Sequence, residues 1–310
     1  MLILPKLLMF TSFLSMVGWS RYGTILLLQT YTPYEIGLLR SIGYLPKVLS
    51  GPVWSILSDT TSPTATLLLS YTIGLVSFSL VRTSLKNHWP FWLFACLRFA
   101  RSATNAISPL TDAVILNITQ GTKNKKGSDE SYGQQRVFSS LAWGLGSLFV
   151  GKLIDIYGVD IIFGYTQVTI VLSMLFTCLI HRQMASEQTT ATTTKNKEGG
   201  GGTARPNPLR VIADVVRKHP ETRRFSAQVA LLGLVMTLSD TVLPMHIELL
   251  EGSRVFNGAS TLIGILGGVP FFWYSKQVSG ARKRTAWDKL SNSPYSHMCV
   301  GQRITSHVTN

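Results

Sequence analysis

The sequence predicts an all-α protein, a polytopic bundle of transmembrane helices, and three observations support this fold class. Charged residues make up only 14% of the 310-residue chain, against about 25% in soluble domains. Several apolar runs approach or exceed the roughly 20 helical residues that cross a bilayer. One of these runs also has small residues along one face, at Ser140, Gly144, Ser147 and Gly151, and such a face lets membrane helices approach closely.

The first 181 residues contain six expected spans, which together form the first half of the molecule. We expect helices over residues 7–29, 36–57, 65–81, 91–118, 137–154 and 161–180. The first run is longer than the core of a signal peptide, about 7–15 residues, so we interpret it as a membrane helix. Pro46 and Pro52 fall inside the second span, where proline kinks a helix.

Composition changes sharply after the sixth span. Residues 182–222 are expected to be a cytoplasmic linker, because the polar, glycine-rich stretch 186–208 cannot bury a core. Residues 207–219 then predict a short amphipathic helix on the membrane surface, or an ordinary soluble turn of helix. Two further spans, 225–247 and 259–274, form a partial second half over residues 223–277, and the tail 278–310 is expected to be disordered.

The charge pattern predicts the orientation and excludes several classes of function. The net charge is +14, and most basic residues fall on the face that holds Lys6, the linker and the tail, so both termini are expected in the cytoplasm. No aromatic and basic platform accompanies this charge, so nucleic acid is not an expected partner. The three cysteines have no metal-ligand spacing, and no catalytic motif is present. We therefore expect no metal, no cofactor and no enzymatic activity.

Four segments resemble a known family in their order and spacing. They are GPVWSILSD at 51–59, SPLTDAVILN at 108–117, YGQQRVFSSLAWGLGSLFVGKLID at 132–155 and GGVPFFWYSK at 267–276. The chain resembles the major facilitator superfamily, in its associated-domain branch, near the lactose-permease-like and nucleoside-proton-symporter-like members. The resemblance implies alternating-access transport. Two departures stand out: Ser55 replaces the family's loop glycine while Asp59 matches, and the family has twelve spans where eight are expected here.

Charges within the apolar runs are the candidate functional residues, because each costs about 2.5–3.5 kcal/mol to insert without a partner or water. Asp240 and Arg21 occupy equivalent helices of the two halves, which the resemblance places around a central cavity. We expect Asp240 to contact substrate or accept a proton. The alternatives are a structural pair, or an Arg21 side chain that reaches the membrane surface.

Two further groups of charges have different expected roles. Arg98 and Arg101 are three residues apart and share a helix face, where they bind an anionic or polar substrate or join a network with carboxylates. Asp112 and Arg136 lie near the cytoplasmic ends of consecutive spans, where a gating or structural ion pair is expected, and Asp59 holds the family's gate position. Most intramembrane aromatics, Trp19 among them, are interpreted as packing residues or interface anchors.

The function expected from these observations is secondary active transport of a small polar solute across the lipid bilayer by alternating access. Protons are the expected coupling ion, with Asp240 as the group whose protonation biases the two states. The alternative follows from the eight expected spans: a truncated, non-transporting membrane protein that acts as a binding or regulatory subunit or has no activity.

Overall fold

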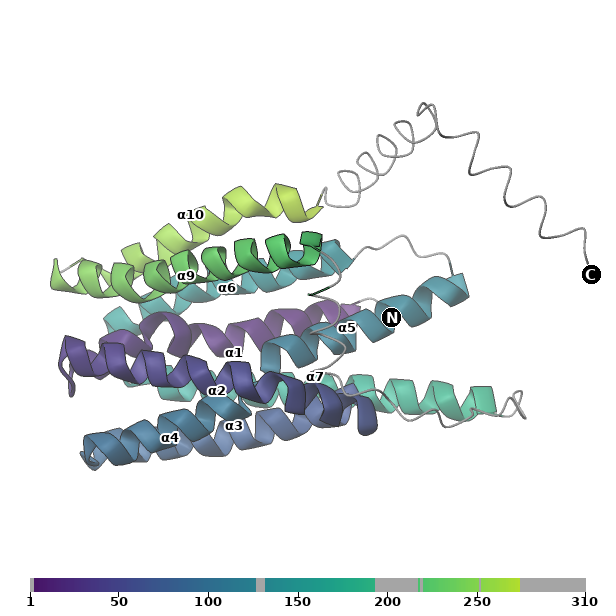
Figure 1. Ribbon diagram of the computed structural model, residues 1–310, viewed down its shortest axis with the longest axis horizontal. Coiled ribbons are helices and arrows are strands. Elements are labelled where there is room, and N and C mark those ends of the chain that lie inside the picture. Colours follow the sequence, from purple (N-terminus) through teal and green to yellow (C-terminus); the bar gives the residue numbers. More distant parts are fainter. Residues whose placement is uncertain (1–2, 127–131, 193–216, 218–219, 251, 274–310) are drawn as a thin grey trace, which may run out of the picture.

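The computed structural model describes residues 3–126, 132–192, 217, 220–250 and 252–273, and every regular element in these ranges is an α-helix (Figure 1). The helices are α1 (Ile3–Leu28), α2 (Pro33–Thr60), α3 (Pro63–Lys86), α4 (Phe91–Thr104), α5 (Ile107–Lys126), α6 (Tyr132–Tyr157), α7 (Ile161–Thr192), α9 (Pro220–Leu249) and α10 (Arg254–Trp273). They lie roughly along one axis and form an elongated bundle (Figure 1). The all-α fold class predicted from the sequence is confirmed.

Four of the described helices are long and apolar enough to cross a membrane. These stretches are Ile3–Leu28, Pro63–Lys86, Gln135–Tyr157 and Ile161–Met184. By contrast, α2 carries Arg40 and Lys47 in its middle, and α4 has only 14 residues. Several long apolar helices in one bundle make the chain an integral, multi-pass membrane protein.

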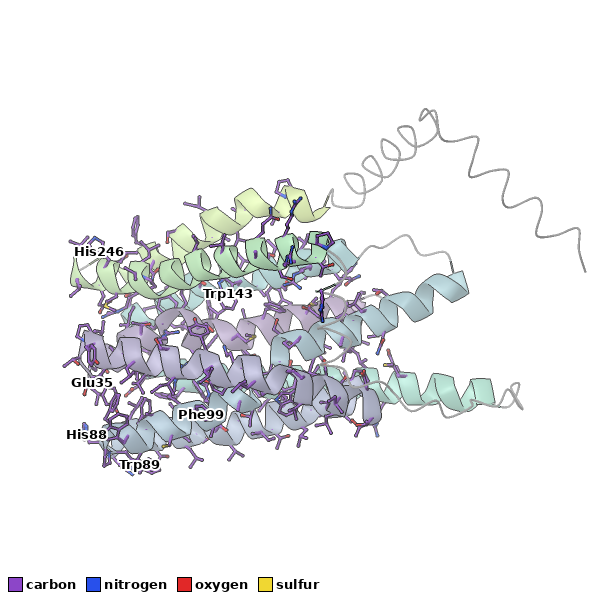
Figure 2. All side chains as sticks on the ribbon, in the orientation of Figure 1. Glu35, His88, Trp89, Phe99, Trp143 and His246 are labelled. Carbon is purple, nitrogen blue, oxygen red and sulfur yellow. The ribbon has the colours of Figure 1, made fainter. Side chains whose placement is uncertain are left out.

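Short capped turns join the helices at one end of the bundle. Thr32 caps α2 by a capping box, in which its hydroxyl accepts from the Glu35 amide and the Glu35 carboxylate accepts from the Thr32 amide. The connection from α6 to α7 turns at Gly158, whose φ of 82° suits glycine. Glu35, His88 and His246 all lie at this end in Figure 2, opposite the N-terminus in Figure 1.

The expected single helix over residues 91–118 is wrong, because the structure divides it into α4 and α5. Proline lacks an amide donor, and its ring clashes with the carbonyl four residues earlier in a helix. A continuous helix would set Pro109 against the carbonyl of Asn105. The chain instead leaves the helix at Asn105 and starts again at Ile107, where proline falls in the first turn and needs no amide donor.

The core of the bundle is organised around α1. This helix packs against α5, α6, α7 and α9, and in Figure 1 it lies between the group α6, α9 and α10 and the group α2, α3 and α4. Its Trp19 ring meets Phe78 edge-on, with centroids 5.5 Å apart. Nearer the start of α1, the Ser12 hydroxyl forms a hydrogen bond of 2.5 Å with the Tyr71 hydroxyl of α3.

The partial second half attaches to the first mainly through α10, which packs along α6. A Cβ atom added to Gly258 would lie 2.5 Å from the carbonyl oxygen of Ser147, and one added to Gly151 would lie 2.5 Å from that of Arg254. The two backbones are therefore in direct contact. The small residues noted on this face of α6 provide the close approach expected of them.

Two boundaries differ from the sequence-based expectation, and two expected segments are outside the described residues. Helix α7 continues to Thr192, into the stretch that polar composition assigned to the linker. Helix α9 begins at Pro220, before the expected start of the seventh span. The expected surface helix at 207–219, apart from residue 217, and the tail 278–310 lie outside the described ranges.

Candidate functional site

Two arginines of α4 stack on one tryptophan of α1 inside the bundle. The Cζ atom of Arg98 lies 5.0 Å from the Trp19 ring centroid, and that of Arg101 lies 4.8 Å from it. Arg101 also lies 4.8 Å from the Phe78 ring. The residues share a face of α4, as their spacing predicts. Cation–π contacts of this kind contribute about 2 kcal/mol each where water is excluded.

The charges of these two arginines are not matched by acidic side chains. Arg98 is only 7% exposed, and its buried Nε has no hydrogen-bond partner. Among the described residues, no ion pair and no hydrogen bond is formed by either guanidinium. Figure 2 places Phe99, the neighbour of Arg98, away from both ends of the bundle. Two like charges are thus held together in the interior, where each is costly without a counter-charge.

The carbonyl groups at the end of α4 do not supply that counter-charge, because other donors occupy them. The Arg101 carbonyl accepts from the Thr104 hydroxyl at 3.0 Å. The Ala103 carbonyl accepts from the Trp54 indole at 2.9 Å, and that of Thr104 accepts from the Ser70 hydroxyl at 3.2 Å. The backbone carbonyls at the helix break therefore have hydrogen-bond donors, while the guanidinium groups beside them have no acceptor among the described residues.

A cavity of about 40 Å³, lined by both polar and apolar side chains, adjoins Arg101. Helices α1, α3, α4, α5 and α7 line it, with hydroxyl groups of Ser15, Ser20, Ser70 and Thr166, the Arg101 side chain and the Asn105 side chain among the lining groups. The Oδ1 atom of Asn105 and the Oγ1 atom of Thr166 are buried without a hydrogen-bond partner. The volume is close to the roughly 30 Å³ that a water molecule occupies in the liquid.

A further basic side chain of α2 lies beside this region. The Arg40 Nη2 atom donates to the hydroxyl of Thr24, and α2 packs against α4. Lys47, further along α2, lies 5.7 Å from the Tyr44 ring. Sequence reasoning noted the charges of α4 but treated Trp19 as packing. Only the folded arrangement brings its ring under both guanidinium groups.

The predicted roles of Arg21 and Asp240 stay predictions. Arg21 is buried within α1, and it is not among the residues that line the 40 Å³ cavity. Asp240 belongs to α9, which packs against α1, but its side chain is outside the described part of the structure. Its role as substrate contact or proton acceptor is taken up below as a proposal.

The gate candidates divide into a pair that meets and a residue that stands apart. The Arg136 Nη1 atom of α6 lies 2.8 Å from the Asp112 Oδ2 atom of α5. Asp59 is exposed at the end of α2, where it lines a second cavity of about 100 Å³ against α5. No ion pair of Asp59 is found within the described ranges. The gating roles of all three residues remain predictions.

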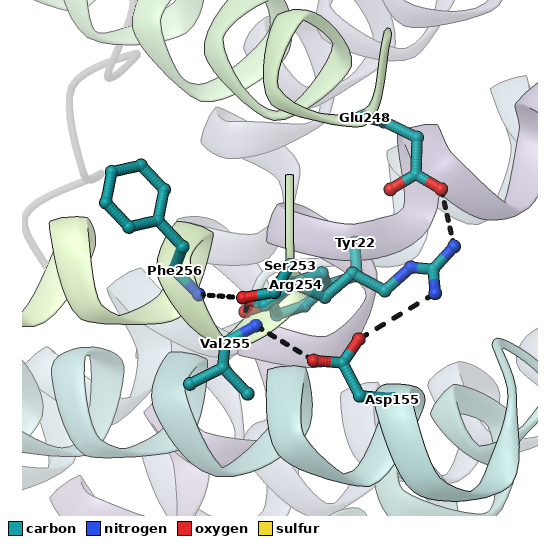
Figure 3. Close-up of polar contacts among 7 residues, drawn as sticks. All are labelled: Tyr22, Asp155, Glu248, Ser253, Arg254, Val255 and Phe256. Carbon is teal, nitrogen blue, oxygen red and sulfur yellow. Dashed lines mark hydrogen bonds and ion pairs between the residues drawn. The ribbon is translucent and has the colours of Figure 1, made fainter. Parts of the chain in front are cut away.

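A cluster that sequence reasoning did not identify joins the two halves (Figure 3). Arg254, the first residue of α10, places its Nη2 atom 2.5 Å from Glu248 Oε1 and its Nη1 atom 3.7 Å from Asp155 Oδ1. The Tyr22 hydroxyl of α1 donates to the Ser147 carbonyl of α6 at 2.6 Å. The halves are therefore linked by charge as well as by glycine contacts. Among the described residues, no group of His, Cys, Asp and Glu side chains could hold a metal ion.

Comparison with known proteins supplies the family. A family model described as the MFS_1 like family matches residues 4–281 of this chain. The chain is also similar to the uncharacterized transporter YwbF of Bacillus subtilis (strain 168), with 28% identity over 132 residues, which cover 42% of this chain and 31% of that protein. The chain thus matches about a third of the length of this relative. No solved structure matches the chain significantly.

Proposed function

Because the chain belongs to the MFS_1-like family of the major facilitator superfamily, we propose that it is a secondary transporter of a small polar solute. The observation that supports this most is the cavity beside Arg101, where polar side chains join apolar ones in lining a space between the helices. Unmatched charge and unpaired polar atoms in the membrane interior are costly, and they usually mark a solute or ion pathway. The partial similarity to a bacterial protein named as a transporter supports the same proposal.

Transport proceeds by alternating access in this proposal, with the two halves rocking about an interior site. When one side opens, the helices α6 and α10 separate, and the Arg254 cluster beside their contact separates with them. Conversion between the states requires a solute that binds them unequally. The Asp112–Arg136 pair at the other end of the bundle would then form and break in the opposite phase, and Asp59 lies at that same end of α2.

We propose Asp240 as the proton acceptor and Arg21 as a second charge that lines the pathway. A carboxyl group in a membrane interior changes its charge when it binds a proton, so it can shift the balance between two states. We further propose that both termini lie in the cytoplasm, because Lys6 and the basic end of α5 share one end of the bundle. A glycan on Asn117 would contradict this orientation.

The test is solute-driven proton movement in proteoliposomes that enclose a pH-sensitive dye such as pyranine. The purified 310-residue chain is screened against panels of small polar solutes, and Asp240→Asn is compared with Asp160→Asn, a change at an exposed aspartate in the α6–α7 turn. We expect Asp240→Asn to abolish coupled uptake with normal expression, and Asp160→Asn to retain it. Unchanged coupling in Asp240→Asn removes that residue from the mechanism, and no uptake by the wild-type chain favours the non-transporting alternative.

A further inference from the structure

We propose that Arg98 and Arg101 bind the solute through an oxyanion group, a carboxylate or a phosphate, which is held against Trp19 at the break between α4 and α5. The inference deepens the proposed transport function, on which its biological meaning rests, by naming the chemical class of the solute. Three features of the structure support it: the missing counter-charge, the donors around the cavity, and the shape of the site.

The first feature is the absence of a counter-charge for the arginine pair among the described carboxylates. Asp112 pairs with Arg136, and Glu248 and Asp155 pair with Arg254. The other three are committed or exposed at helix ends: Glu35 closes the capping box of α2, and Asp59 and Asp160 are exposed. An anionic ligand is the partner that this arrangement lacks.

The second feature is the set of donors around the arginines. Arg101, Asn105 and Ser20 line the cavity near the start of α5 and carry side-chain donors. The Ser15 and Ser70 hydroxyls of the same lining already donate to backbone carbonyls. The N-terminus of a helix carries partial positive charge, and broken membrane helices use such ends to bind anionic groups of their solutes. Arg98 does not line the cavity itself, but its buried, unpaired Nε is a further donor on the same face of α4. A neutral sugar or amide could accept these hydrogen bonds but could not neutralise two guanidinium groups.

The third feature is the shape of the site. The Trp19 ring lies against both guanidinium groups, so the pair is held as a rigid platform that a planar or tetrahedral oxyanion can reach with several donors at once. A cavity of about 40 Å³ has room for a small group such as a carboxylate. The rest of the solute therefore has to lie beyond it, in space that opens as the halves move apart.

Binding can be measured without transport, on the full chain purified in neutral detergent with chloride as the only other anion. We would follow the unfolding midpoint, Tm, as sodium phosphate or sodium acetate replaces sodium chloride at constant ionic strength. A ligand that binds the folded state raises Tm with its concentration. We expect a saturable rise for at least one of the two oxyanions. No saturable rise with either would overturn the proposal.

The variants are Arg98→Gln and Arg101→Gln, with Arg82→Gln as the matched control. Arg82 is exposed on α3 and lies 6.0 Å from the Phe163 ring, and it does not line the cavity. We expect the oxyanion affinity to fall at least tenfold in both site variants and to stay within twofold in the control.

Equal responses of all variants to oxyanions would overturn the proposal. If a glutamine variant does not fold, Arg101→Lys decides the matter. Lysine keeps the charge but loses the planar fork of donors, so oxyanion affinity should still fall severalfold. An unchanged affinity in Arg101→Lys would count against direct contact.

A lipid headgroup presents the same phosphate chemistry, so the source of the anion needs its own comparison. In nanodiscs of phosphatidylcholine we expect soluble phosphate or acetate to raise Tm as in detergent. Stabilisation seen only with phosphatidylglycerol would assign the pair to a lipid and overturn the solute proposal. Oxyanion binding without any uptake would refute the transport function but not the oxyanion site. Uptake of an uncharged solute without oxyanion binding would refute the oxyanion site but not the transport function.

Discussion

Replacing Gly258 with alanine should separate α6 from α10. The added Cβ would lie 2.5 Å from the Ser147 carbonyl oxygen and 2.6 Å from the Leu148 Cα atom. Both contacts are with backbone, so no side chain can rotate away, and the helices have to move apart by about 1 Å to restore ordinary contact distances of about 3.5 Å. Overpacking of this kind costs about 1–3 kcal/mol.

Alanine also stabilises a helix relative to glycine, by up to about 1 kcal/mol, so a control is needed that has this gain alone. Gly267→Ala provides it, because Gly267 lies in the same helix and a Cβ there would meet nothing within 4 Å. The difference in stability between the two variants should therefore equal the packing cost. At roughly 2–4 °C per kcal/mol, the expected difference in Tm is roughly 2–12 °C.

The assay is thermal unfolding of both variants in the same detergent, followed by the loss of the monodisperse peak in size-exclusion chromatography. Gly151→Ala serves as a second test of the same contact, since its Cβ would lie 2.5 Å from the Arg254 carbonyl oxygen and 2.7 Å from the Tyr22 hydroxyl. We expect both contact variants to melt below Gly267→Ala. Equal Tm values for Gly258→Ala and Gly267→Ala would refute the reasoning, because they would mean that α6 and α10 are not in backbone contact.

Three further predictions concern local interactions. Asp112→Asn and Arg136→Gln should each lower stability by about 0.5–1 kcal/mol, a small value because the Arg136 side chain is 36% exposed and screened by solvent; exchanging the two charges should restore it in a double-mutant cycle, and failure to do so would count against the contact. Trp54→Phe should cost about 1–3 kcal/mol, because it leaves a carbonyl at the end of α4 without its donor; a Tm equal to that of the wild type would contradict this. Hydrogen bonds from the Thr32 amide and hydroxyl lower the pKa of Glu35 below its ordinary value of 4.5. The stability that the ionised Glu35 contributes is therefore present above pH 4.5 and is lost as pH falls through the lower pKa of the folded state. Glu35→Gln should remove this part of the acid dependence of Tm, and a pH profile identical to that of the wild type would exclude the cap as its source.

Much of the fold could be predicted from the sequence because apolar length and helical spacing are local properties. They gave the fold class, the order of the helices and the shared face of Arg98 and Arg101. The break between α4 and α5 was also readable, since Pro109 forbids a hydrogen bond to Asn105 in a continuous helix. It was missed because proline within a membrane span was interpreted as a kink, and kinked helices stay continuous, as α2 does with Pro46 inside it.

The contacts that define the candidate site could not be predicted, because they join residues far apart in the chain. Nothing in the local sequence of Trp19 indicates that two guanidinium groups of α4 will lie against its ring. The same is true of Arg254, which reads as an isolated basic residue in a short loop and proves to contact Glu248 and Asp155 together. Local pattern identifies which residues are unusual, while their partners depend on how α1, α4, α6 and α10 pack.

The paired arginines Arg136 and Arg254 differ from Arg98 and Arg101 in exposure and in carboxylate partners, and we propose gating for the first group and binding for the second. Arg254 and Arg136 lie near the ends of their helices, partly exposed, and each has a carboxylate partner, so exchange of partners can open and close a contact at little cost. Arg98 and Arg101 have no carboxylate partner among the described residues, which is why we assign them to ligand binding. Since the described residues around the arginine site come from the first half, on α1–α5 and α7, oxyanion binding should survive changes such as Gly258→Ala that disturb the contact with α10. Transport, which requires that contact to close, should not. A variant that binds oxyanion with wild-type affinity but has lost uptake would thus place the gate at α10 and the recognition of the solute in the first half.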